Sequence, residues 1–282
     1  MVTLCSRLTL AAIVGLVLAG SAAAQDISFK DPVGDDKGAG GYTYPTDVVY
    51  KAGSFDITNF RMNVRGGQAE FEVGVNALLE DPWRMNTGFS VQMIFIFIDT
   101  DHKEGSGFTQ GLPGLNVAFA PADAWDRAII LSPQSTSKVR SEVEAKAAAM
   151  KATVIVPNRT RGSSRTISAA VPLADLGGGD PSTWGFQVVM QSNEGFPSTG
   201  DLLTRKVNEY EGQHRFGGGN DGECDPHVMD LLAGTGTGDA SEAAAQFKSL
   251  ANECTPDGTA KKLATLPMVR HARVPVSAQK GN

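Results

Sequence analysis

Hydrophobic and polar residues alternate along much of the first two-thirds of the chain. Phe60, Met62 and Val64 alternate with polar neighbours, and the apolar residues of 69–75 do the same. Successive side chains of a strand point to opposite faces, so the pattern is typical of antiparallel strands with one buried face. The Gly-Gly pair between the two runs suits a tight turn, which predicts that the two strands form a hairpin.

A second kind of strand is indicated by the run VQMIFIFI at residues 91–98, which is apolar at every position but one. The run is too short and too rich in Ile and Phe for a helix, so it predicts a central strand that is covered on both faces. Further strands are expected at 115–119, 127–131, 152–156, 165–171 and 184–190. Many short strands separated by Gly, Pro, Ser and Asp predict an all-β fold, an immunoglobulin-like sandwich of two antiparallel sheets.

The segment 138–151, KVRSEVEAKAAAMK, fits two structures. Its composition is typical of a helix, but Val139, Ser141 and Val143 also fit one face of a strand. We favour a pair of strands here, with a helix as the alternative.

The pattern changes after Asp239. Residues 241–253, SEAAAQFKSLANE, have apolar residues at helical spacing, and Asp239 or Ser241 can cap the first turn. We therefore expect one short C-terminal helix. The residues from 255 to 282 have little periodicity and are expected to form a strap or a tail.

The first residues have the pattern of a signal peptide. Arg7 precedes the apolar run LTLAAIVGLVLAG, and a small-residue cleavage motif ends at Ala24. The run is too short to span a bilayer, so we expect an exported protein, periplasmic or extracellular, that is not an integral membrane protein; the alternative is an uncleaved membrane anchor. The expected organisation is a signal peptide (1–24), a β-sandwich binding module (25–235) and a C-terminal helix with an extended tail (236–282), tied to the sandwich by a disulfide.

Acidic residues outnumber basic ones, and the formal net charge is −6. Residues 1–24 contain one Arg and no acid, so their removal changes the net charge to −7. This balance argues against nucleic acid or an anionic membrane as a partner.

Removal of the same leader leaves two cysteines, Cys224 and Cys254. In an oxidising compartment we expect them to form a disulfide that closes a loop of about 30 residues. Two free thiols are the alternative.

Oxygen ligands gather in two acidic segments. Asp31, Asp35 and Asp36 lie within the glycine-rich stretch DPVGDDKGAGGYTYP, whose flexible backbone allows oxygens to converge. Asp99 and Asp101 end the apolar run, and strand alternation places both carboxylates on the same side, where they need a cation, arginines or water. These five residues are candidate calcium ligands, with ordinary turn chemistry as the alternative for the first segment.

Other chemistry has less support in the sequence. The absence of a His or Cys set argues against zinc and copper, and no G-x-S-x-G or H-E-x-x-H signature is present. Paired acids on a single strand do not suit glycoside hydrolysis, which needs carboxyl groups across a cleft. No haem is expected, since C-x-x-C-H is missing and Met62, Met93, Met190 or His102 would be unusual axial ligands.

Four aromatic residues lie in segments that contain Gly or Pro: Tyr42, Tyr44, Trp83 and Trp125. Their flat rings could stack on sugar rings while nearby polar side chains bond the hydroxyl groups. The alternative is that Trp83 and Trp125 fill the ends of the sandwich.

Several blocks, among them YTYPT, IDTD and RFGGGNDGECDPHVMDLL, resemble the C-terminal module of bacterial glucodextranases and archaeal amylopullulanases, which is related to DOMON-type sandwiches. The resemblance runs over nearly all of residues 26–233. It implies an antiparallel β-sandwich without catalytic activity, linked to carbohydrate binding or to holding an enzyme at the cell surface. Related sandwiches bind calcium or, in some branches, haem b, and the five aspartates named above fall in the acidic blocks of the family.

We therefore expect an exported, non-catalytic module that is stabilised by calcium and binds a polysaccharide or a cell-envelope glycan. The runner-up is an envelope scaffold or protein-interaction module that binds no glycan. A haem-binding electron carrier and a hydrolase are the remaining alternatives.

Overall fold

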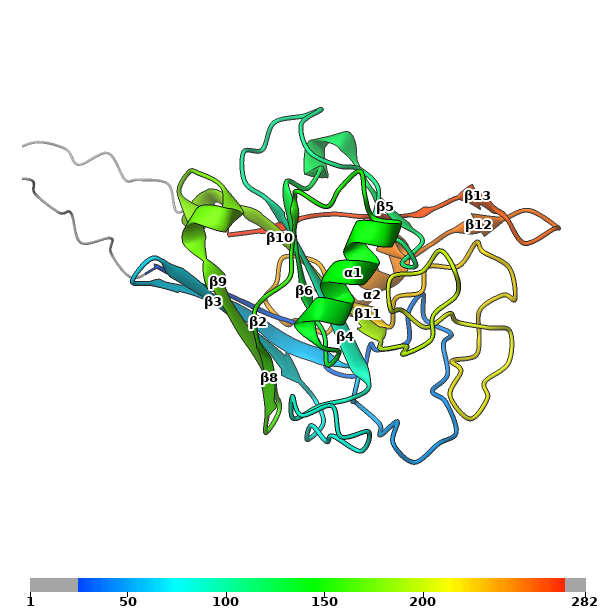
Figure 1. Cartoon of the computed structure of the whole chain (residues 1–282). Coiled ribbons are helices and arrows are strands. Elements are labelled where there is room, and N and C mark those ends of the chain that lie inside the picture. The colour runs from blue at the N-terminus through cyan, green and yellow to red at the C-terminus, as the bar shows by residue number, and fades with distance from the viewer. Residues whose placement is uncertain (1–24, 272–282) are drawn as a thin grey trace, which may run out of the picture.

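The computed structural model describes residues 25–271, and it shows the expected sandwich of antiparallel sheets (Figure 1). The expected signal peptide at 1–24 and the end of the tail, 272–282, lie outside the described residues. None of the helices within 25–271 is long and apolar enough to cross a membrane.

The first sheet has five antiparallel strands in the spatial order β1-β2-β3-β9-β8. Their bounds are β1 (Gln25–Lys30), β2 (Ile57–Arg65), β3 (Gln68–Val75), β9 (Thr166–Pro172) and β8 (Thr160–Ser163). The second sheet has the order β11-β10-β4-β6-β7, and β15 also pairs with β10. Its bounds are β11 (Asp230–Leu231), β10 (Gly185–Ser192), β4 (Gln92–Asp99), β6 (Arg127–Leu131), β7 (Val154–Ile155) and β15 (Val269–Arg270). Two small pairs complete the fold: β12 (Glu253–Cys254) with β13 (Ala260–Lys262), and β14 (Ala264–Leu266) with β5 (Val117–Phe119).

Apart from the ambiguous segment 138–151, every strand range expected from the sequence overlaps a strand of the structure. The strands β1, β8, β11, β12, β13, β14 and β15 lie outside the expected ranges. The expected hairpin joins β2 to β3, with Arg65 opposite Gln68. Gly66 and Gly67 both have positive φ, 56° and 76°, which a turn of this length requires and which glycine adopts without strain.

The strand β4 is buried on both of its faces, as its continuous apolar run predicts. Ile94, Ile96 and Ile98 point into the core between the two sheets. Met93, Phe95 and Phe97 alternate with them and join a second core on the outer face of the sheet. Since neither face meets water, the alternation of apolar and polar residues is absent here.

A helix covers that outer face, where a pair of strands was expected. Residues Thr136–Lys146 form α1, which lies in front of the second sheet in Figure 1. Val139 and Val143 are buried against the sheet, whereas Ser141, which would share their face in a strand, is exposed. The prediction of strands was wrong because two apolar residues four apart share a face in either structure.

The C-terminal segment crosses the sandwich. The expected helix is present as α2 (Glu242–Ser249), with Leu250 buried after its last turn. Cys224 and Cys254 form the expected disulfide. The chain then pairs β14 with β5 and β15 with β10, so residues 264–270 lie against both cores.

Loss of the disulfide is expected to lower the free energy of unfolding by about 3 kcal/mol, because the bond restricts a loop with a sequence separation of 30 residues in the unfolded chain. Thermal unfolding with and without a reductant measures this effect. The Cys224→Ala/Cys254→Ala variant is the control, and it should melt at the reduced temperature under both conditions. The prediction would be contradicted if the wild-type protein kept its melting temperature after the reductant had opened the disulfide.

Candidate functional site

The glycine-rich stretch after β1 runs from the first sheet to the end of the second. Asp31 follows β1 directly, and its backbone N–H donates to the carbonyl of Thr58 at 3.1 Å. Its Oδ1 accepts a hydrogen bond from the backbone N–H of Ala233 at 3.0 Å, just beyond β11. Farther along, the N–H of Gly34 donates to Oδ2 of Asp56 at 2.8 Å. The stretch is thereby fixed between segments that are far apart in the sequence.

Four buried aspartates meet at this place. Asp31, Asp35 and Asp230 bring carboxylate oxygens within 4.8 Å of one another, and all three side chains are buried. Asp56, which is 1% exposed, lies beside them and raises the pKa of Asp31 and of Asp230 by charge repulsion. We call Asp31, Asp35, Asp56 and Asp230 the acidic cluster.

Burial is the main cause that raises the pKa of every carboxyl group in the acidic cluster, since a carboxylate loses its hydration there. It raises the pKa of Asp31 to about 9, that of Asp35 to about 7 and that of Asp56 to about 6. The pKa of Asp230 is raised well above its ordinary value. Repulsion from neighbouring carboxylates adds to each rise, so the cluster resists carrying four negative charges by itself.

Several oxygens of the cluster lack a partner. Within residues 25–271, Oδ2 of Asp31, both oxygens of Asp35 and Oδ1 of Asp56 are buried without a hydrogen bond. No Lys or Arg side chain of the described residues forms an ion pair with the cluster. Buried charges are normally paired or bound to a metal. An oxygen-only donor set on loop and strand backbone fits a hard cation such as calcium.

A pocket of about 320 Å³ lies next to the cluster, on the same stretch of chain. Its lining residues are Asp36, Lys37, Tyr42, Thr43, Tyr44, Ala52 and Gly53. The hydroxyl of Tyr44 donates to the carboxylate of Asp36, and the hydroxyl oxygen of Tyr44 accepts a hydrogen bond from the N–H of Phe55 at 3.1 Å. The hydroxyl of Tyr42 donates to the carbonyl of Pro226 at 2.9 Å. Two of the predicted ligand-binding residues, Tyr42 and Tyr44, are thus brought together, with Asp36 between the pocket and the acidic cluster.

The other two predicted metal ligands lie elsewhere. Asp99 pairs with Gly185 at one end of β10, whereas Asp230 pairs with Met190. Five residues along a strand correspond to about 17 Å. The structure therefore separates Asp99 and Asp101 from Asp31, Asp35 and Asp36, and forms a second group in which Asp99 and Asp101 lie near Asp126.

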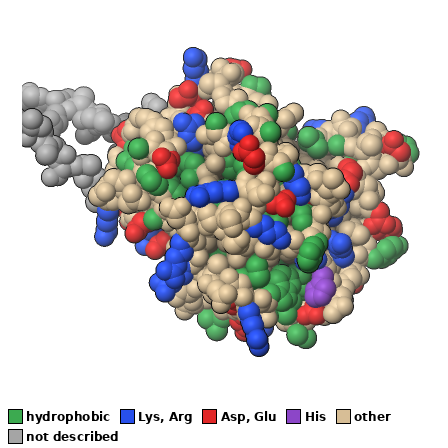
Figure 2. All heavy atoms as spheres, viewed as in Figure 1, with side chains coloured by type: hydrophobic (Ala, Val, Ile, Leu, Met, Phe, Trp, Pro, Cys, Tyr) green, Lys and Arg blue, Asp and Glu red, His purple; other side chains and the backbone are tan. Residues whose placement is uncertain are grey.

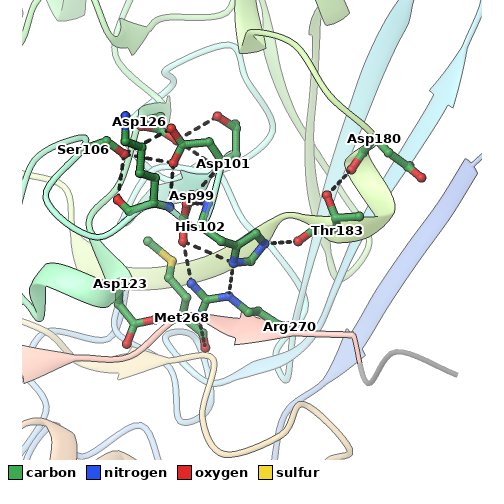
Figure 3. Close-up of polar contacts among 12 residues, drawn as sticks. Asp99, Asp101, His102, Ser106, Asp123, Asp126, Asp180, Thr183, Met268 and Arg270 are labelled. Carbon is green, nitrogen blue, oxygen red and sulfur yellow. Dashed lines mark hydrogen bonds and ion pairs between the residues drawn. The ribbon is translucent and has the colours of Figure 1, made fainter. Parts of the chain in front are cut away.

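This second group already has its counter-charge, as Figure 3 shows. Nη2 of Arg270 on β15 lies 2.5 Å from Oδ2 of Asp99, and Nη1 lies 2.5 Å from Oδ1 of Asp123. Asp126 accepts the N–H and the hydroxyl of Thr100 at 2.8 and 2.7 Å. Asp101 accepts the hydroxyl of Ser106 at 2.9 Å.

His102 completes this arrangement. Its Nδ1 accepts a hydrogen bond from Nε of Arg270 at 2.8 Å, so the ring proton belongs on Nε2, which donates to the carbonyl of Thr183. The ring and the guanidinium together tie β15 to the end of β4. We therefore interpret the group of Asp99, His102, Asp123 and Arg270 as a clasp that holds the C-terminal segment.

The change Arg270→Ala is expected to lower the free energy of unfolding by about 2 kcal/mol, because it leaves the buried carboxylate of Asp99 without its counter-charge. The loss is smaller than for a fully buried ion pair, because the Arg270 side chain is 30% exposed. Urea unfolding measures the effect, and Lys103→Ala, at an exposed position in the adjacent loop, is the matched control. Equal stability of the two variants would contradict the role of the clasp.

The two tryptophans lie in different surroundings, and only Trp125 is excluded as a sugar-binding surface. Trp125 is 0% exposed, packs on Phe97 and Phe108, and donates its Nε1–H to the carbonyl of Gln110 at 2.8 Å. The prediction of a stacking role for Trp125 was wrong, because a ring enclosed in the second core presents no face to a ligand. Trp83 is half-buried and packs edge-on against Tyr50, so only part of its ring is free.

Sequence reasoning missed Asp56 and Asp230 in the acidic cluster. Both are single acids among apolar residues, in SFDITNF and HVMDLL. A lone acid in an apolar run is a signal of a buried, partnered carboxylate. That signal identifies the residue, but it does not show which other acids lie beside it.

Comparison with known protein families gives a match over most of the chain. The family described as the C-terminal binding-module, SLH-like, of glucodextranase matches residues 27–269. The matched range begins in β1 and ends at the first residue of β15, so it contains the acidic cluster and the pocket beside it. A search of curated proteins found no match.

Proposed function

The chain belongs to the family of C-terminal, SLH-like binding modules of glucodextranase, and from this we propose that it is an exported, non-catalytic module that binds a glycan and is stabilised by calcium. The signal-peptide pattern of residues 1–24 and the disulfide between Cys224 and Cys254 support export. The family supports binding as the role of the chain.

The observation that carries the proposal is that one stretch, residues 31–45, supplies two acids of the acidic cluster, Asp31 and Asp35, and most of the lining of the pocket. In the proposed site, Asp31, Asp35 and Asp230 hold calcium through the carboxylate oxygens that converge within 4.8 Å, and Asp56 contributes negative charge beside them. Calcium supplies the positive charge that the buried carboxylates lack. The bound ion fixes the backbone of the stretch, and with it the walls of the pocket.

The pocket offers the surfaces that a sugar requires. Tyr42 and Tyr44 form part of its wall, while Lys37 and Thr43 place an ammonium and a hydroxyl group at exposed positions. A mostly apolar wall with a few polar groups is the usual character of a small-ligand site. We propose that one or two sugar units of a polysaccharide or a cell-envelope glycan bind here.

The variant Lys37→Ala/Thr43→Ala is expected to bind glucan at least about tenfold more weakly, because it removes two polar contacts of the pocket without disturbing a buried residue. Isothermal titration in calcium with a panel of soluble α- and β-glucans measures the affinity. The control is Lys103→Ala/Thr109→Ala, which changes the same residue types at exposed positions outside the pocket.

Two outcomes would contradict the proposed function. If no glucan of the panel binds the wild-type protein in calcium, the glycan claim fails, and a pull-down from envelope extracts would then test the role of a protein-interaction module. A Soret band in the protein purified from cells would show that haem, rather than a glycan, is its ligand.

A further inference from the structure

Positive charge is concentrated in one part of this acidic protein. Residues 138–165 contain seven Lys and Arg residues and two Glu residues, a net charge of +5 in a chain whose formal net charge is −6. This segment includes most of α1, together with β7 and β8. In the view of Figure 1 α1 lies toward the reader, and Figure 2 shows Lys and Arg side chains spread over this face.

A cavity of about 410 Å³ opens beside the segment, on three pieces of chain: 84–87, 132–136 and 158–160. Arg84 and Arg159 line it, and no acidic residue does. Its other side chains are largely amides and hydroxyls, among them Asn86, Gln134, Thr136 and Asn158. A cavity with two guanidinium groups and no carboxylate favours an anion.

The two arginines are available to a ligand. Within residues 25–271, neither the guanidinium of Arg84 nor that of Arg159 forms an ion pair or a hydrogen bond. Asp81 is the acid closest in sequence to Arg84, but its oxygens accept the N–H groups of Met85 and Asn86 at 2.7 and 2.8 Å. Its charge is thereby directed to the backbone rather than into the cavity.

The walls of the cavity are held in place before any ligand arrives. The bonds to Asp81 fix the turn that contains Arg84, which has a positive φ of 53°. Elsewhere in the lining, the hydroxyl of Thr136 donates to the carbonyl of Asn158 at 3.1 Å, and Nη2 of Arg140 donates to Oδ1 of Asn158 at 2.9 Å. Arg140 thus adds a third positive charge behind the amide, and preorganised walls reduce the entropy lost on binding.

We propose that this cavity binds an acidic polysaccharide, with Arg84 and Arg159 contacting its carboxylate or sulfate groups and the amide and hydroxyl side chains contacting its sugar hydroxyls. Guanidinium groups bond the two oxygens of such anions in a bidentate geometry. The many neutral polar groups of the lining favour a charged sugar over a bare anion. This site is separate from the pocket at Tyr42 and Tyr44, and the inference does not rest on the proposed function.

Affinity for dextran sulfate and for polygalacturonate, each compared with uncharged dextran of similar length, tests the inference. The wild-type protein is expected to bind at least one acidic polymer, with an affinity that falls as salt is added. The variant Arg84→Gln/Arg159→Gln should bind that polymer at least about tenfold more weakly, because each arginine supplies a charge-assisted hydrogen bond. The control Arg65→Gln/Lys248→Gln makes the same change of net charge at positions outside the cavity and should bind like the wild type.

The inference would be overturned if no acidic polymer bound the wild-type protein at low salt, or if the cavity variant and the control variant lost affinity equally. It would also be overturned if uncharged dextran bound as tightly as the acidic polymers, both to the wild-type protein and to the cavity variant. Equal losses in both variants would show attraction by overall charge alone. Titration of the Arg84→Gln/Arg159→Gln variant with the neutral glucan panel separates the two sites, since the pocket at Tyr42 and Tyr44 is unchanged in it. The melting temperature of each variant verifies that it is folded.

Discussion

In calcium the protein without residues 1–24 is expected to unfold at a higher temperature than in chelator, with a gain in the free energy of unfolding of about 4 kcal/mol when calcium is a thousandfold above its Kd. Only the folded chain brings Asp31, Asp35 and Asp230 within reach of one ion, because residues 31 and 230 are distant in sequence. A ligand that binds the folded state alone raises stability in proportion to the logarithm of its concentration. Differential scanning calorimetry in calcium and in chelator measures the gain.

The gain from calcium is expected to grow as the pH rises from about 5 to about 8. Without a cation, the folded protein keeps protons on Asp31, Asp35 and Asp56, whose pKa values are about 9, 7 and 6, while the unfolded chain releases them near pH 4. Stability in chelator therefore falls as the pH rises through this range. Calcium replaces the protons and removes this loss. A gain that shrinks with rising pH would contradict binding at the acidic cluster.

The variant Asp35→Asn/Asp230→Asn separates calcium binding from other effects of the ion. Asparagine keeps the size of each side chain and removes two of the mutually repelling carboxylates, so this variant should be at least as stable as the wild type in chelator at pH 8. Its melting temperature should not respond to calcium. Asp99→Asn/Asp101→Asn is the control for the second acidic group, where Arg270 already provides the positive charge, and should keep its response. If calcium raised the melting temperature of Asp35→Asn/Asp230→Asn as much as that of the wild type, the assignment of calcium to the acidic cluster would be wrong.

Trp125→Ala is expected to lower the free energy of unfolding by about 4 kcal/mol, the range for a large aromatic side chain removed from a core. The change leaves a cavity beside Phe97 and Phe108, and it also removes the Nε1–H that bonds the carbonyl of Gln110. Chemical unfolding of the variant and the wild type measures the loss. Glucan affinity of the folded fraction should stay unchanged, since the ring is enclosed.

Trp83→Ala is the comparison for this second prediction. The Trp83 ring is half-buried and packs against the first core, so its loss should cost clearly less stability than that of Trp125. If Trp125→Ala abolished glucan binding and left the free energy of unfolding unchanged, the prediction would be contradicted. The ring would then be a ligand contact, and its burial in the second core would not stabilise the fold.

The sequence predicted those elements whose pattern is decided locally. The alternation of Phe60, Met62 and Val64 and the two positive-φ glycines of the hairpin specify β2 and β3 within a short window. The unbroken apolar run of β4 likewise shows a strand with two covered faces. The α1 segment could not be decided in this way, because Val139 and Val143 share a face in both a strand and a helix, and the sheet beneath them selects the helix.

Local patterns in the chain therefore specify the all-β sandwich, most of its strands, the C-terminal helix, the pairing of Cys224 with Cys254 and the acidic character of the stretch at residues 31–45. Which acids lie side by side depends instead on the folded arrangement of the strands. The folded chain places Asp31 beside the segment that contains Asp230, through a hydrogen bond between Asp31 and Ala233, which are 202 residues apart. It also pairs Asp99 with Arg270, which are 171 residues apart. Side-chain alternation is a property of neighbouring residues, whereas contacts between distant residues depend on how strands are ordered in the sheets, which no local pattern specifies.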